Sequence, residues 1–112
     1  MATEDIRQKL LPRFRETTVD RVERISTLLL EWERGAATAE SGQELARELH
    51  TLKGETRMMG FGGIAAVVHA AEDLLKVLPR EKPGDRVDAL LRACDAIVPM
   101  LEAPPGGDSV SQ

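Results

Sequence analysis

Two helical patterns of hydrophobic residues, separated by only three residues, constrain the fold of this chain more than any other feature. The first runs from Glu44 to Met59 and the second from Gly63 to Leu78, with Gly60-Phe61-Gly62 between them. A glycine-rich break this short ends one helix and starts an antiparallel neighbour. The sequence therefore predicts a helical hairpin in the middle of the chain.

One histidine lies on the solvent side of the first pattern. The core stripe of that helix recurs at spacings of four and three residues and comprises Leu45, Leu49, Leu52, Thr56 and Met59. His50 lies about 140° around the helix from the centre of this stripe. Its neighbours one turn away are Ala46 and Gly54, although glycine inside a helix costs about 1 kcal/mol relative to alanine. Gly54 therefore either keeps the approach to His50 open or permits close backbone packing.

The residues from His50 to Gly54 read His-Thr-Leu-Lys-Gly and match the H-x-x-K-G motif of a known family. In this motif the chain resembles histidine-phosphotransfer (HPt) domains, and the longer match reaches Gly60-Phe61 and then the segment from His69 to Leu75. This longer pattern is similar to the N-terminal phosphotransfer domain of CheA-type chemosensory kinases, nearest those of Frz-like gliding-motility systems. The resemblance covers residues 4–102.

The resemblance implies a set of site residues. His50 would be the phosphorylated residue, and Lys53, His69 and Glu72 would form the polar group around it. Two positions depart from the family pattern, which more often has small residues where this chain has Glu55 and Thr56. The sequence leaves open whether acidic Glu55 affects partner choice or phosphate affinity.

Phosphoryl transfer gives these residues defined roles. A histidine with an ordinary pKa of about 6.5 is largely neutral near pH 7, so one ring nitrogen is free to attack phosphorus. We expect Glu72 to accept a hydrogen bond from the other nitrogen, with His69 as a further partner in the same network. Lys53 can offset charge on the phosphoryl oxygens, and Arg57 adds positive charge nearby.

Such a domain can be a phosphocarrier rather than a complete enzyme. ATP, Mg²⁺ and the acceptor aspartate can all come from partners, so we expect no cofactor bound by the domain itself. The expected partners are a histidine kinase catalytic domain and the receiver domain of a response regulator. Gly60-Phe61-Gly62-Gly63 resembles a phosphate loop only superficially, because it follows a helix and lacks the P-loop lysine and hydroxyl residue.

The remaining patterns complete an all-α fold. Thr3 can cap a short N-terminal helix, and Pro12 then either kinks this helix or starts a new one. Hydrophobic residues keep helical spacing from Phe14 to Gly35, and a loop over residues 35–42 offers Ser41 as the next cap. We predict an antiparallel up-down four-helix bundle over residues 1–102, with a possible short N-terminal helix extension.

The C-terminal third contains two more helix-breaking prolines. Pro79 should stop the third helix, and residues 80–84 should form a charged turn. A final amphipathic helix should start near Asp85, and Pro99 should bend or shorten it. Residues 103–112 read APPGGDSVSQ, which predicts a flexible tail or the start of a linker.

Composition excludes several classes of function. The net charge is −4 and the isoelectric point is about 5.2, which argues against nucleic acid as the main partner. No apolar run approaches the roughly 20 residues of a membrane span, and the N-terminus has no signal-peptide pattern, so we expect a cytoplasmic domain. Cys94 and Trp32 are interpreted as core residues rather than as a reactive thiol and a binding site.

Two other functions are compatible with the same residues. The chain could be a helical docking or dimerisation module whose histidine is never phosphorylated. A metal site built from His50, His69 and Glu72 is disfavoured, since metal sites in helical bundles normally need several inward-facing carboxylates. We expect an isolated domain of this kind to be monomeric. The family resemblance and the tail favour a fragment of a larger kinase over an independent protein.

Overall fold

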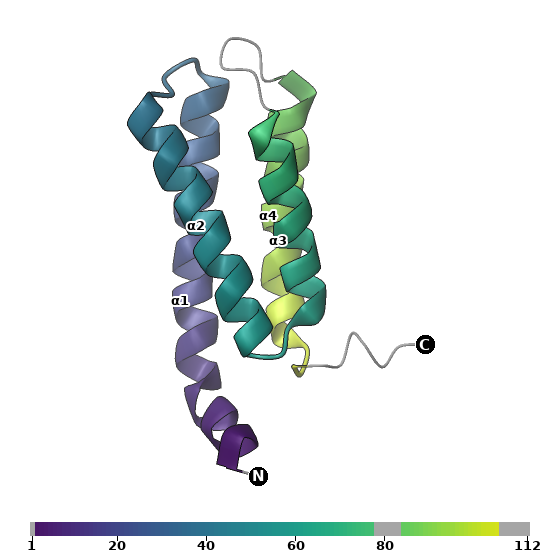
Figure 1. Cartoon of the computed structure of the whole chain (residues 1–112). Coiled ribbons are helices and arrows are strands. Elements are labelled where there is room, and N and C mark those ends of the chain that lie inside the picture. The colour runs from purple at the N-terminus through teal and green to yellow at the C-terminus, as the bar shows by residue number, and fades with distance from the viewer. Residues whose placement is uncertain (1, 78–83, 106–112) are drawn as a thin grey trace.

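A computed structural model describes residues 2–77 and 84–105 of the chain. It contains four helices: α1 (Ala2–Glu33), α2 (Ala39–Met58), α3 (Gly62–Lys76) and α4 (Gly84–Glu102). Successive helices run antiparallel, and α4 packs beside α1 (Figure 1). The all-α four-helix bundle predicted from the sequence is confirmed.

The central hairpin forms because Gly60 ends α2 in a left-handed conformation. Its φ is +86°, its N–H donates to the carbonyl of Arg57, and the N–H of Phe61 donates to the carbonyl of Thr56. These two bonds satisfy carbonyls at the helix end, in the arrangement of a Schellman motif. Gly35 ends α1 in the same way, with φ +77°. Both glycines were predicted as helix ends, and both predictions are confirmed.

The start of α2 differs from the prediction. The helix begins at Ala39, several residues before Glu44, and the capping residue is Thr38 rather than Ser41. The Thr38 hydroxyl accepts from the Ser41 N–H at 3.0 Å, and the Ser41 hydroxyl accepts from the Thr38 N–H at 2.8 Å. This reciprocal capping box satisfies two backbone donors and extends the helix toward its N-terminus.

Two prolines lie inside helices. α1 continues through Pro12, and its first turns lean away from the axis of the rest of the helix (Figure 1), so of the two alternatives predicted for this proline the kink is seen and a new helix is not. α4 continues through Pro99 as far as Glu102, so this proline does not shorten it. The predictions for Pro79, for residues 80–83 and for most of the tail (106–112) fall outside the described residues.

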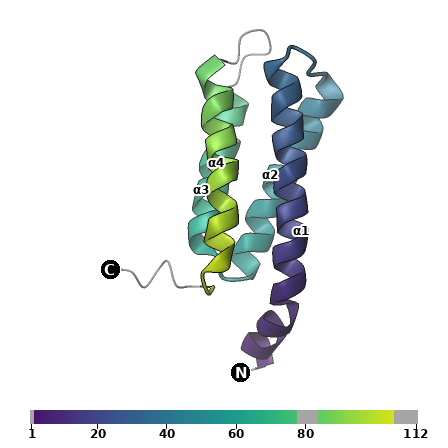
Figure 2. The ribbon, with the colours of Figure 1, turned by 180° about the vertical axis from the view of Figure 1, so that it is seen from behind.

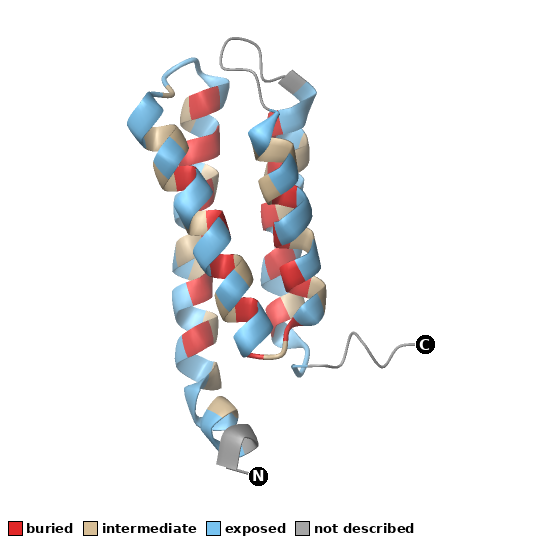
Figure 3. Cartoon of the chain, in the orientation of Figure 1, coloured by how far each residue is buried: buried red, intermediate tan, exposed pale blue. Residues whose placement is uncertain are grey.

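The core lies where the four apolar stripes meet (Figure 3). Its most completely buried large side chains come from all four helices and are Ile25, Leu29, Leu45, Leu52, Ile64, Val68 and Val87. Phe14 and Phe61 stack with ring centroids 5.5 Å apart, which joins α1 to the turn between α2 and α3. Trp32 and Cys94 belong to the same core, as predicted, and burial raises the pKa of the Cys94 thiol.

Candidate functional site

His50 is carried by the middle of α2, next to core residues but facing away from them. Leu49 and Leu52 are buried, whereas the His50 side chain is 75% exposed. This orientation follows from the helical repeat, because a residue next to the buried stripe turns about 100° away from it. The predicted solvent-facing position of His50 is confirmed.

Glu72 approaches His50 from the neighbouring helix α3. The distance from His50 Nδ1 to Glu72 Oε2 is 3.3 Å, and Lys53 Nζ lies 2.6 Å from Glu72 Oε1. The side chains of Lys53 and Glu72 are each only 15% exposed. An exposed imidazole therefore contacts a carboxylate that is itself held by a largely buried ammonium group.

The environment of Glu72 favours its charged form. Burial raises the pKa of this carboxyl, but hydrogen bonds from Lys53 and then from His50 outweigh burial, so the pKa lies below its usual value. A carboxylate accepts hydrogen bonds but cannot donate them. In the His50 tautomer with a proton on Nδ1, that N–H donates to Glu72 and the lone pair of Nε2 is free for chemistry.

His69 does not join this group in the described structure. Its Nε2 lies 3.7 Å from Asp73 Oδ2, one turn along the same helix, and both side chains are more than half exposed. The expected contact of His69 with the His50–Glu72 pair is therefore not seen. Residue 69 lies about 60° around α3 from residue 72, which turns it further toward solvent.

Small residues leave open space beside His50. Ala46 and Gly54 are both exposed, and a Cβ atom added at Gly54 would meet nothing within 4 Å. Close packing therefore gives no reason for the glycine at this position. Of the two explanations for Gly54, the structure favours the one in which glycine keeps the approach to His50 open.

Two arginines add positive charge along the exposed side of α2. Arg57 was expected there, and Arg47, one turn before His50, was not singled out by sequence reasoning. Both are exposed, and neither forms an ion pair with any residue that the structure describes. Helical spacing could have identified Arg47, since residues three apart share a face.

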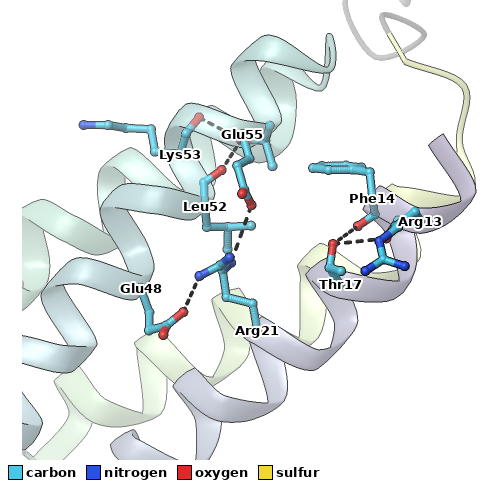
Figure 4. Close-up of polar contacts among 9 residues, drawn as sticks. Arg13, Phe14, Thr17, Arg21, Glu48, Leu52, Lys53 and Glu55 are labelled. Carbon is cyan, nitrogen blue, oxygen red and sulfur yellow. Dashed lines mark hydrogen bonds and ion pairs between the residues drawn. The ribbon is translucent and has the colours of Figure 1, made fainter. Parts of the chain in front are cut away.

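Glu55 lies on a different side of α2 from His50. Its carboxylate is 3.5 Å from Arg21 Nε of α1, and Arg21 Nη1 is also 2.5 Å from Glu48 Oε1. Figure 4 shows Arg21 between these two carboxylates, with the Lys53 side chain extending away from them. The departure from the family pattern at Glu55 thus forms a contact between α1 and α2.

A hollow of about 330 Å³ adjoins the His50 site. It extends toward the N-terminal end of α2 and is lined by Trp32, Ala39, Gly42, Gln43, Ala46, Glu72, Leu75 and Lys76. The residues that the structure describes contain no group of three or more His, Cys, Asp or Glu side chains placed to hold a metal ion. None of the described helices is long and apolar enough to span a membrane.

Comparison with known proteins identifies relatives that are named for gliding motility and chemotaxis. The family model described as "Hpt domain" matches residues 9–99. The chain is 41% identical to a gliding motility regulatory protein of Myxococcus xanthus over 104 residues, which are 91% of this chain. It is 33% identical to the chemotaxis protein CheA of Treponema pallidum over a region that covers 89% of this chain. It is 34% identical to the chemotaxis protein CheA of Halobacterium salinarum over 74% of this chain.

In each case the matched region is only 13% of the relative, so this chain spans a small part of those proteins. No solved structure gave a significant match.

Proposed function

This chain belongs to the Hpt domain family, and we propose that His50 carries a phosphoryl group from a CheA-type kinase domain to an aspartate of a receiver domain. The family match and the chemotaxis and motility relatives support a role in histidine phosphotransfer signalling. The observation that carries the proposal is the contact of an exposed His50 with Glu72, which is itself held by Lys53.

In the first step the lone pair on His50 Nε2 attacks the γ-phosphorus of ATP held by the kinase domain. A nitrogen–phosphorus bond forms, the bond from phosphorus to the bridging oxygen breaks, and ADP leaves. The imidazole becomes cationic as it attacks, and the Glu72 carboxylate stabilises this charge through the Nδ1 proton. The partner supplies the nucleotide and Mg²⁺.

In the second step a carboxylate oxygen of the receiver aspartate attacks the same phosphorus. The nitrogen–phosphorus bond breaks, its electron pair returns to Nε2, and an acyl phosphate forms on the partner. His50 is thereby restored. The domain needs only to present one nitrogen to two partners in turn, which suits a residue that is 75% exposed.

Lys53 acts mainly through Glu72 in this mechanism. Its Nζ lies 2.6 Å from the carboxylate, and its side chain is largely buried, so it orients Glu72 before the phosphoryl group arrives. Arg47 and Arg57 are better situated to meet an anionic partner, because both are exposed on the side of α2 that carries His50.

Because the phosphoryl group comes from ATP, the proposal also places this domain in the cytoplasm.

The proposal is tested with the CheA-type kinase domain of a close relative, labelled ATP and the whole chain. We expect acid-labile, base-stable label on the parent and on His69→Gln, and none on His50→Gln. Chasing with a receiver domain should then remove the label. If His50→Gln is labelled at the parent rate, or if no CheA-type kinase domain labels the folded parent, the proposal is wrong and a docking module becomes the better account.

A further inference from the structure

A groove on the far side of the bundle takes no part in the proposed phosphoryl transfer. This groove has a volume of about 670 Å³ and lies between α1 and α4. Figure 2 shows these two helices in front, whereas Figure 1 shows α2 and α3, which carry His50 and Glu72, in front. Its lining residues are Val19, Val22, Glu23, Ser26 and Thr27 from α1 and Cys94, Asp95 and Val98 from α4.

The floor of this α1–α4 groove is apolar and partly open to solvent. Val22 and Cys94 are buried beneath it, while Val98 is 37% exposed. Leu30, one turn beyond Ser26 on the same side of α1, is another exposed large hydrophobic residue. The groove thus offers small apolar surfaces in a row rather than a single deep pocket.

The two walls of the groove carry exposed acidic side chains. Glu23 on α1 and Asp95 on α4 are exposed, and neither forms an ion pair within the described part of the chain. Glu16 and Asp88 continue the two walls two turns earlier on each helix. Among the residues that the structure describes, no lysine or arginine lines the groove.

The other seam of α1 is built differently. There Arg21 pairs with Glu48 and Glu55, and Arg24 binds both oxygens of Glu44 at 2.7 and 2.9 Å. Carboxylates on that seam are matched by cations from the same chain. Glu23 and Asp95 on the α1–α4 seam have no such cation among the described residues, which leaves them accessible to a cation of another molecule.

From this arrangement we propose that the α1–α4 groove binds a basic amphipathic helix of a partner protein. Small apolar side chains of that helix would cover Val19, Val22 and Val98, and its lysines or arginines would meet Glu23 and Asp95. The part of α1 from Val19 to Thr27 is about two turns, or roughly 12 Å, long. The partner therefore needs apolar residues at i, i+3 or i+4, and i+7.

The position of the groove gives this binding a consequence. Because it lies across the bundle from His50, an occupied groove leaves the α2–α3 face open to a kinase or a receiver. The partner helix can stay attached while the phosphoryl group is gained and lost. This inference does not depend on phosphorylation of His50.

The probe for this groove is a synthetic amphipathic helix of about four turns, with leucine and alanine on one face and lysines on its flanks. Titrated into the ¹⁵N-labelled whole chain, it should shift the amide signals of residues 19–27 and 94–98. Two control peptides have the same length as the probe. One has glutamate in place of lysine, and the other has the composition of the probe in a scrambled order. Both should bind at least tenfold more weakly.

Matched variants decide whether charge at this groove is responsible. Asp95→Lys and Glu23→Lys should each lower the affinity for the lysine peptide by about tenfold. Asp73→Lys changes the net charge equally but lies on α3, so it should leave affinity almost unchanged. Val98→Ser, which removes an apolar contact without adding charge, should weaken binding severalfold. Thermal melts verify that each variant is folded.

Several outcomes would overturn the proposal. Signal shifts concentrated on α2 and α3 would place the peptide on the other face. If the scrambled peptide bound as tightly as the amphipathic one, net charge alone would explain the attraction. The same conclusion would follow if Asp73→Lys lost as much affinity as Asp95→Lys and Glu23→Lys. Absence of any binding to the folded parent would remove the groove as a site for a basic helix.

Discussion

The two broad faces of this bundle use their carboxylates in opposite ways. On the α2–α3 face, Glu72 is largely buried and contacts both Lys53 and His50. On the α1–α4 face, Glu23 and Asp95 are exposed beside an apolar groove and have no ion-pair partner among the described residues. A carboxylate with partners in its own chain organises a site, whereas one left unpaired beside apolar surface is available to another molecule.

The largest expected effect comes from removing the carboxylate of the α2–α3 face. Glu72→Ala should slow phosphorylation of His50 tenfold or more, because the hydrogen bond that orients the imidazole is lost. Stability should also fall, by about 1 to 3 kcal/mol, because Glu72→Ala leaves the largely buried Lys53 ammonium without its carboxylate. Rates with a CheA-type kinase domain and chemical denaturation measure the two effects.

Asp95→Ala is the matched control for this prediction, because it removes a carboxylate from the opposite face. Its phosphorylation rate should equal that of the parent. Equal rates for Glu72→Ala and the parent would make the His50–Glu72 contact incidental.

A second substitution closes the access to His50 without touching its contacts. Gly54→Gln should reduce transfer by roughly three- to tenfold through steric obstruction, with a smaller loss for Gly54→Ala. The melting temperature should stay equal or rise, because helix propensity gains up to about 1 kcal/mol and a Cβ atom at this position meets no neighbour. Ala96→Gln, at an exposed position of α4, serves as the control and should leave transfer unchanged.

A destabilised Gly54→Ala would show that packing, not access, selects glycine at this position. A stable Gly54→Gln with unchanged transfer would defeat the access interpretation. Thermal melts and transfer rates on the same protein samples separate these results.

A third substitution weakens the ion-paired seam between α1 and α2. Arg21→Ala should lower the free energy of unfolding by about 1 kcal/mol, because it leaves Glu48 and Glu55 without their common cation. Arg24→Ala should cost less, since the pair of Arg24 with Glu44 is more exposed. Denaturant melts measure both losses. At high salt, the free energies of unfolding of both variants should lie closer to that of the parent, because salt screens the ion pairs. A larger loss in Arg24→Ala would reverse the assigned importance of the two pairs.

The smallest expected effect is on the pH dependence of stability. The pKa of Glu72 is lower in the folded protein than in the unfolded chain, so this carboxylate contributes stability above its unfolded pKa of about 4.3. That contribution should disappear as pH falls through the folded pKa. Glu72→Gln should therefore lose less stability between neutral pH and acid than the parent does. Identical acid profiles would show that the carboxylate is not stabilised by folding.

Helical periodicity predicted most of the fold and the central part of the site. The stripe through Leu45, Leu49 and Leu52 identified both the buried side of α2 and the exposed position of His50. Gly35 and Gly60 were identifiable as helix ends because only a left-handed residue completes the terminal hydrogen bonds. The pairing of His50 with Glu72 followed from family resemblance together with the helix order.

The features that sequence reasoning missed depend on contacts between or across turns. Thr38 and Ser41 cap each other, and this local bond outweighs the small-residue composition that suggested a loop. Pro99 is retained inside a helix whose packed stripe continues past it to Leu101, whereas Pro12 lies where the packed stripe of α1 begins, between Leu11 and Phe14. The contact of Arg21 with Glu55 depends on the rotation of α1 against α2, which no pattern within one helix specifies.

The most direct test of the central claim is to locate the phosphoryl group by atom. The ¹⁵N-histidine-labelled chain, phosphorylated by a CheA-type kinase domain, can be examined by ³¹P and ¹⁵N NMR, with peptide mass spectrometry to identify the residue. We predict phosphorus on Nε2 of His50, with the Nδ1 proton retained toward Glu72. Phosphorus on Nδ1 of His50, or on His69, would contradict this account.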